Sequence, residues 1–252
     1  MRQARLFFCA LGFMTRLPTP RLDGFQPDWI ARSSPYYPVV GWIVGAVSSA
    51  VLLIASRFWP GLPAAALAVG AGLLATGGFH EDGLADTVDG LGGGQTRARR
   101  LEIMKDSRIG SYGALALWTA LTIKAAALAT LAPLQAALLL ILTHGAARAF
   151  AVVVMATQRY AGDPDVAKLK PAPMGARPGE AVIAVVLGLA PMVLLPPLQA
   201  TAGLILGACG ATALALIARR LVGGFTGDVL GGVEQLAELG LLLGFAIRGL
   251  GA

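Results

Sequence analysis

Long apolar stretches alternate with short polar ones along most of the chain. A helix of about 20 residues crosses a bilayer, so stretches near this length predict membrane-spanning helices at 36–58, 62–79, 112–132, 134–157, 180–197, 201–218 and 233–251. Pro191, Pro196 and Pro197 interrupt the fifth of these. The pattern predicts an all-α, polytopic integral membrane protein that forms a single membrane-embedded domain over residues 1–252.

The N-terminal segment has a different pattern. Its apolar run from Leu6 to Met14 is too short to span, and Thr15–Pro20 closes it. Apolar side chains such as Phe7 and Leu11 can share one face of a helix. We therefore expect residues 1–35 to contain an interfacial helix that lies on the membrane.

Composition agrees with a membrane protein. Of the 252 residues, 56% are hydrophobic and 13% are charged, whereas soluble domains are about 25% charged. The formal net charge of +6 fits orientation in a membrane better than nucleic-acid binding, so we expect membrane lipids and no nucleic acid as partners.

The distribution of charge predicts the orientation. Sixteen of the 20 Lys and Arg residues lie in segments 1–35, 80–111, 158–179 and 219–232, while the alternate connections carry none. This is the positive-inside pattern. It predicts that the N-terminus and the 14 acidic residues lie on or next to the cytoplasmic side, and that the C-terminus lies outside.

Segment 80–111 is the most polar part of the chain. Asp82, Asp86 and Asp89 are spaced four and three apart, which puts them on one face of a helix. Carboxylates together with substrate phosphate oxygens are typical ligands of Mg²⁺. The alternative is a solvated acidic face. Glu81 points about 100° away from Asp82 and is a weaker candidate.

A second acidic group lies in residues 219–238. Glycines precede Asp228, and Glu234 and Glu238 follow four apart. We interpret Asp228 as a further metal ligand, although acids at a helix N-terminus also complement the helix dipole. Within the predicted spans lie Lys124, His144 and Arg148; His144 is equally consistent with packing, and Arg148 requires a carboxylate or a substrate phosphate as its partner.

Two long motifs resemble a known family. Residues Thr76–Leu91 (TGGFHEDGLADTVDGL) and Leu101–Gly110 (LEIMKDSRIG) are similar to the cobalamin synthases, or adenosylcobinamide-GDP ribazoletransferases. Thr15–Pro18, Arg159–Ala161 and Gly223–Asp228 fit the same family. The chain departs from it at Glu81, where a leucine is usual, and in the 163–175 loop.

The resemblance implies a Mg²⁺-dependent enzyme of the cell inner membrane. Such enzymes join adenosylcobinamide-GDP to α-ribazole or its 5′-phosphate and release GMP. Phosphoryl transfer rests mostly on positioning and charge neutralisation. We expect Asp82, Asp86 and Asp89 to hold Mg²⁺, with Asp228 completing the set, and either Asp89 or His80 to act as the base.

Further residues of these motifs are expected to bind substrate. Lys105 and Arg108 would neutralise phosphate oxygens, and Asp106 would orient them. Ser107 lies in the Leu101–Gly110 motif and Thr226 in the Gly223–Asp228 motif, and both are expected to contact substrate. Arg148 would bind substrate if its partner is a phosphate.

Two other functions are consistent with parts of the pattern. CDP-alcohol phosphotransferases of lipid synthesis also place paired aspartates at the end of a span, but their signature has a different spacing. An ion-coupled transporter would use Lys124, His144 and Arg148 as a relay. Small-residue pairs such as Gly41/Gly45 and Gly203/Gly207 permit close helix contacts, either within the chain or in a homo-oligomer.

Overall fold

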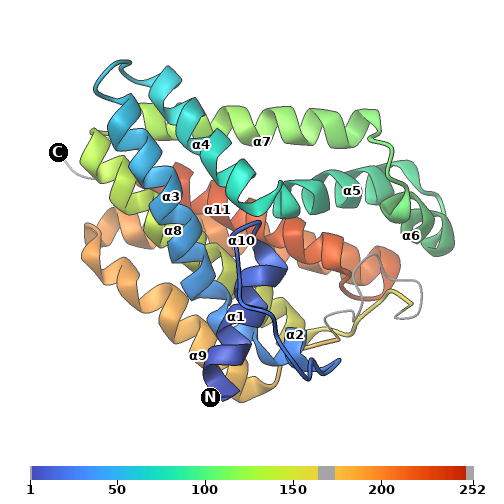
Figure 1. Cartoon of the computed structure of the whole chain (residues 1–252). Helices are drawn as coiled ribbons and strands as arrows, with labels where there is room; N and C mark the ends of the chain where they lie inside the picture. The colour runs from blue at the N-terminus through green and yellow to red at the C-terminus, as the bar shows by residue number, and fades with distance from the viewer. Residues whose placement is uncertain (1, 164–173, 248–252) are drawn as a thin grey trace.

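Helices account for the regular structure of this computed structural model, which describes residues 2–163 and 174–247. Figure 1 shows long helices side by side, with α1 packed against them. The helices are α1 (Arg2–Met14), α2 (Trp29–Arg32), η1 (Ser34–Tyr36), α3 (Tyr37–Ala55), α4 (Leu62–Thr76), α5 (Phe79–Gly93), α6 (Arg97–Lys105), α7 (Ser111–Ala129), α8 (Pro133–Thr157), α9 (Pro178–Leu189), η3 (Ala190–Leu194), α10 (Pro197–Val222) and α11 (Gly227–Phe245).

The expected class is confirmed: the chain is an all-α, polytopic membrane protein. Four described helical segments are each long and apolar enough to cross a membrane, namely Ser34–Ala55, Ser111–Ala129, Pro133–Thr157 and Pro197–Val222. The bent pair α4 and α5 would make a fifth crossing. Helix α11 is 19 residues long but carries three acids, and Pro178–Leu194 is short. The count of seven spans therefore stays a prediction.

Small residues bring two pairs of helices into close contact. A Cβ on Gly45 of α3 would lie 2.6 Å from the Cα of Ile141 on α8. A Cβ on Gly203 of α10 would lie 2.9 Å from the carbonyl oxygen of Leu241 on α11. Both small-residue pairs identified in the sequence are thus used inside the chain.

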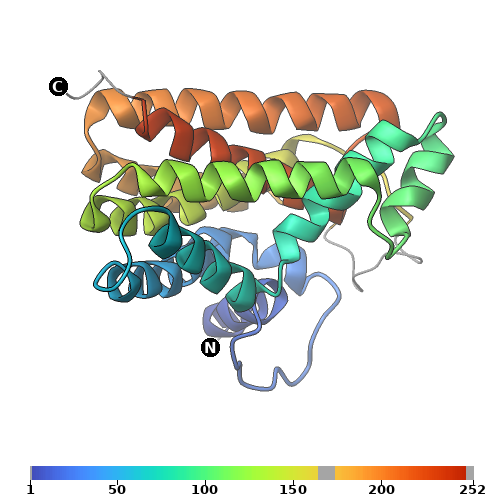
Figure 2. The same cartoon turned by 90° about the horizontal axis from the view of Figure 1, so that it is seen from above.

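A 90° bend separates α4 from α5. Gly77 and Gly78 both have positive φ, of 70° and 69°, a conformation that glycine adopts without a steric penalty. The side chain of Arg16 lies over Gly77, where a Cβ would come 2.5 Å from its Nε. Figure 2 shows that α5 leaves this bend and crosses α7, against which it packs.

The bend changes the interpretation of segment 80–111. It is two helices rather than a polar loop, and α5 packs against α7 and α11 with His80, Asp86 and Asp89 buried. The last helix also differs from expectation. It begins at Gly227 rather than at 233, because Thr226 caps it by accepting the N–H of Val229 (3.2 Å). Residues 164–173 of the 163–175 loop and 248–251 of the predicted last span lie outside the described residues.

Helix α1, which the sequence predicts as an interfacial helix, packs against the rest of the protein through its apolar side chains. Leu11 and Met14 belong to the main hydrophobic core, while Leu6 and Cys9 form a second cluster with Trp29. The end of α1 is thereby fixed next to the bend between α4 and α5, where the candidate site is found.

Candidate active site

An open cleft of about 810 Å³ lies beside this bend. The end of α1, the end of α4, the start of α5 and the middle of α7 form its walls. Its charged lining residues are Arg16, Glu81 and Asp82. Clefts of this volume are typical of sites for small molecules and cofactors. This one is lined by one guanidinium group and two carboxylates.

The three aspartates of α5 have different surroundings. Asp82 is exposed in the cleft, whereas Asp86 and Asp89 are 7% and 8% exposed. The carboxylate of Asp89 accepts the backbone N–H groups of Gly110 (2.7 Å) and Gly113 (2.9 Å) at the start of α7. Asp89 therefore has a structural contact that the sequence did not indicate, and both of its carboxylate oxygens are engaged by backbone N–H groups.

Helix α11 brings Asp228 next to α5. A Cβ on Gly83 would lie 2.8 Å from the carbonyl oxygen of Asp228 and 3.0 Å from the Cα of Gly231. The two helices therefore touch backbone to backbone between Asp82 and Asp86 on one side and Asp228 on the other. The hydroxyl of Thr226, besides capping α11, lies 3.5 Å from Asp228 Oδ2. The contact of Gly83 with Asp228 and Gly231 joins the two acidic motifs in one region.

Two shorter motifs pair with each other beside Asp228. The N–H of Phe225 donates to the carbonyl of Arg159 (3.0 Å), and that of Ala161 donates to the carbonyl of Phe225 (2.8 Å). Arg97 locks this pairing by donating to the carbonyls of Val222 (2.8 Å) and Ala161 (2.9 Å). The turn before α11 is thus held rigidly to the end of α8.

Tyr160 confirms that this turn places Asp228 close by. Burial raises the pKa of the Tyr160 phenol, and the negative charges of Asp228 and Asp163 raise it further. The Tyr160 ring also packs edge-on against Phe225, with centroids 5.6 Å apart.

The loop between α6 and α7 carries the other expected substrate-binding residues. Lys105, Ser107 and Arg108 are exposed there. Asp106 binds Arg108 through several hydrogen bonds, the shortest from Nη2 to Oδ2 at 2.6 Å. Asp106 thus orients Arg108, and hydrogen bonds from Arg108 lower the pKa of the Asp106 carboxyl to about 2.

A buried ionic cluster lies near the middle of α7, α8 and α11. Lys124 binds Glu238 (2.8 Å) and is 3.6 Å from Glu81. Arg148 binds Glu234 (2.9 Å), and both are 1% exposed. Of the two partners expected for Arg148, the structure therefore shows the carboxylate. A cavity of about 20 Å³ in this cluster, room for about one water molecule, is lined by Glu81 and His80.

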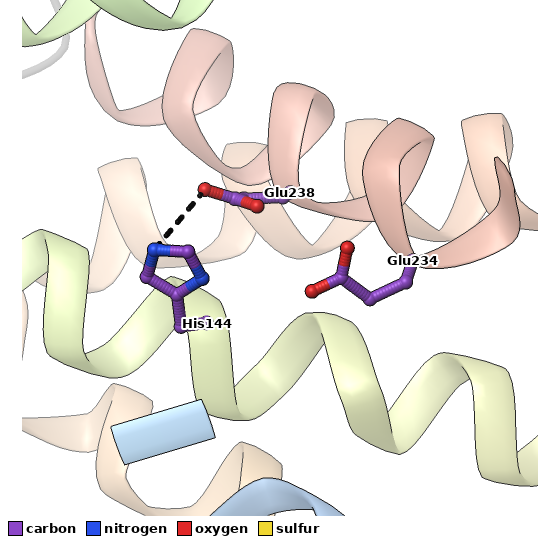
Figure 3. A group of neighbouring side chains, drawn as sticks. All are labelled: His144, Glu234 and Glu238. Carbon is purple, nitrogen blue, oxygen red and sulfur yellow. Dashed lines mark ion pairs between the residues drawn. The ribbon is translucent and has the colours of Figure 1, made fainter. Parts of the chain in front are cut away.

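One group in this cluster has the spacing of a metal site. The ligand atoms of His144, Glu234 and Glu238 lie within 4.8 Å of one another (Figure 3). However, Arg148 and Gln235 occupy the two oxygens of Glu234, and Lys124 occupies one of Glu238. A divalent cation would face two buried positive charges there, which disfavours metal binding in this cluster. Among the described residues, the aspartates predicted as metal ligands do not form a group of three with this spacing.

Comparison with known proteins identifies the chain's relatives. The sequence model of the cobalamin-5-phosphate synthases matches residues 6–246. The chain belongs to this family. A relative from Leptothrix cholodnii is 43% identical over 97% of this chain and 96% of its own. One from Shewanella halifaxensis is 40% identical over 98% and 97%, and one from Shewanella baltica is 38% identical over 94% and 92%. All three are named adenosylcobinamide-GDP ribazoletransferase, and no solved structure matches.

Membership confirms the resemblance stated from the motifs. The protein is an enzyme, a transferase with a late role in cobalamin biosynthesis. The structure adds residues that the sequence did not select: Arg16 and Glu81 line the cleft with Asp82. The sequence feature that could have identified Arg16 is its position within the short Thr15–Pro18 motif. Glu81 was ranked below Asp82 because the two side chains point about 100° apart on the helix.

Proposed function

We propose that this chain joins adenosylcobinamide-GDP to α-ribazole, or to α-ribazole 5′-phosphate, in a Mg²⁺-dependent reaction that releases GMP. A ribose hydroxyl of ribazole attacks the phosphorus next to the cobinamide, and the bond to GMP breaks. The observation that carries this proposal is an 810 Å³ cleft lined by Arg16 and Asp82, with the backbone of Asp228 on α11 packed against Gly83 of α5, in a member of this family.

The acidic residues would form the metal site. Asp82 and Asp86 on α5, with Asp228 on α11, offer the hard oxygen ligands that Mg²⁺ prefers. Mg²⁺ bound there would neutralise the charge of the diphosphate. Gly83 and Gly231 hold α5 and α11, the helices that carry these carboxylates, in backbone contact.

The basic residues would hold the substrate. Arg16 is next to Asp82 in the cleft and can bind a diphosphate oxygen through a planar fork. Arg108, oriented by Asp106, and Lys105 would neutralise phosphate oxygens at the end of the bundle. The proposed orientation places this end, with the connections around residues 94–110 and 223–226, at the cytoplasmic face of the inner membrane.

A single assay tests the proposal. Purified protein in a bilayer is incubated with adenosylcobinamide-GDP, α-ribazole or its 5′-phosphate, and Mg²⁺, and GMP is measured. We expect GMP in equal amount to the new corrinoid, only with both substrates present, and none with EDTA. GMP release without ribazole, or unaffected by EDTA, would overturn the proposal.

A further inference from the structure

A second pocket, of about 350 Å³, lies at the end of α8 and α10. Its lining residues are Thr157, Gln158, Arg159, Arg219 and Gly223. The two guanidinium groups carry its charge, and no acidic residue lines it among the described residues. The ion pairs of the described residues include neither Arg159 nor Arg219, so both retain their donors for an anion.

The walls of this pocket are rigid. Gln158 donates its side-chain N–H to the carbonyl of Ala215 on α10 (3.1 Å). The carbonyl of Arg159 accepts the N–H of Phe225, and a Cβ at Gly224 would collide with that carbonyl. The backbone that carries Arg159 is therefore clamped between α10 and the turn before α11. The backbone positions from which the two arginines reach the pocket are therefore fixed, and their planar guanidinium forks suit a phosphate.

The pocket is joined to the proposed metal site by a short piece of chain. Gly223 precedes Asp228 by five residues, so their Cα atoms lie no more than about 18 Å apart. The same turn carries Thr226, the cap of α11. An anion in the pocket and a reacting group at Asp228 can thus belong to one ligand.

We propose that Arg159 and Arg219 bind the phosphate monoester of the second substrate, ribazole 5′-phosphate. The inference rests on the proposed function. In that reaction the transferred phosphoryl group becomes the link between corrinoid and ribazole, so the additional phosphate in the family's name has to arrive on ribazole. A phosphate dianion matches two guanidinium forks.

The test compares the two forms of ribazole in three variants. Arg159→Gln and Arg219→Gln each remove one fork, and Arg220→Gln is the matched control because Arg220 is exposed on the same helix turn outside the pocket. We expect the first two variants to raise KM for ribazole 5′-phosphate by about tenfold, the worth of a charge-assisted hydrogen bond. KM for free ribazole, kcat and the Arg220→Gln enzyme should stay unchanged.

Other outcomes would overturn the assignment. Equal losses with both forms of ribazole would make the arginines structural, and a raised KM for adenosylcobinamide-GDP would place the nucleotide phosphates in the pocket. A loss that appears only in anionic and not in zwitterionic bilayers would identify a lipid headgroup as the ligand. If the unmodified enzyme releases no GMP with either form of ribazole, the proposed function itself is refuted.

Discussion

Gly83 on α5 and Gly231 on α11 lie backbone to backbone: a Cβ on Gly231 would be 3.1 Å from the Cα of Gly83. This contact fixes the separation between the helices that carry Asp82 and Asp228. It depends on the absence of a side chain at either position, because any Cβ would force the helices apart.

Gly83→Ala should therefore reduce activity. Overpacking at a tight contact costs about 1–3 kcal/mol, and the shift of α11 should lower GMP release by about tenfold or more. GMP assays and thermal unfolding in detergent measure both effects. Gly70→Ala in α4 is the control, because nothing lies within 4 Å of a Cβ there. Full activity in Gly83→Ala would contradict a site shared by the two helices.

Asp82→Asn and Asp228→Asn should each lower GMP release by at least about 100-fold, since removing a group that stabilises transition-state charge has this order of effect. They should also raise the Mg²⁺ concentration needed for half-maximal rate. Asp23→Asn, in an exposed turn, serves as control. Normal Mg²⁺ dependence in both variants would remove these residues from the metal site.

Asp89 should act through the fold. Asp89→Ala leaves the N–H groups of Gly110 and Gly113 without their acceptor, at a cost of about 1–3 kcal/mol for each buried group. Asp89→Asn keeps one acceptor oxygen and should be milder. Unfolding measurements distinguish the two roles: unchanged stability with lost activity would restore Asp89 as a metal ligand or base.

The pair Arg148–Glu234 predicts a double-mutant effect. Glu234→Leu or Arg148→Met alone leaves an uncompensated buried charge, which costs about 3–5 kcal/mol. The double variant removes both charges and should recover most of the lost stability. Unfolding of the four proteins in detergent completes the cycle, and additive losses would show that the pair is not coupled.

The Asp106–Arg108 pair predicts a flat response to pH. The pKa of Asp106 is lowered to about 2, so its contact is present above the ordinary carboxyl pKa of 3.8 and is lost only as pH falls through about 2. Asp106→Asn should therefore change KM without moving the acidic limb of a pH–rate profile measured above pH 5. A shift of that limb would assign the titration to Asp106.

Hydropathy predicted most helices because burial in lipid and burial in protein select the same residues. The spans near α3, α4, α7, α8 and α10 were found within a few residues of their ends. The last helix was placed six residues late, since Gly227, Asp228 and Gly231 disfavour a predicted span. Its acids are tolerated because Arg148 and Lys124, far away in sequence, neutralise them.

The site was predictable in its residue types but not in its partners. Spacing alone placed Asp82 and Asp86 on one helix and suggested Asp228 as a companion. It could not show that Asp89 caps α7, since Gly110 and Gly113 are 21 and 24 residues away. The angle on the helix set Glu81 apart from Asp82, but it could not show that Glu81 reaches Lys124 while Asp82 is exposed.

The distance in sequence between α5 and its partners has a consequence for biogenesis. The hydrogen bond from Gln235 to the Glu81 carboxylate joins two residues that are 154 positions apart, so it cannot form until α11 has been synthesised. Glu81 can pair with Lys124 of α7 before then, but α5 also packs against α11, so α5 cannot reach its final position when it leaves the ribosome. Its docking has to follow synthesis of α11, and the binding site should therefore be the last part of the molecule to mature.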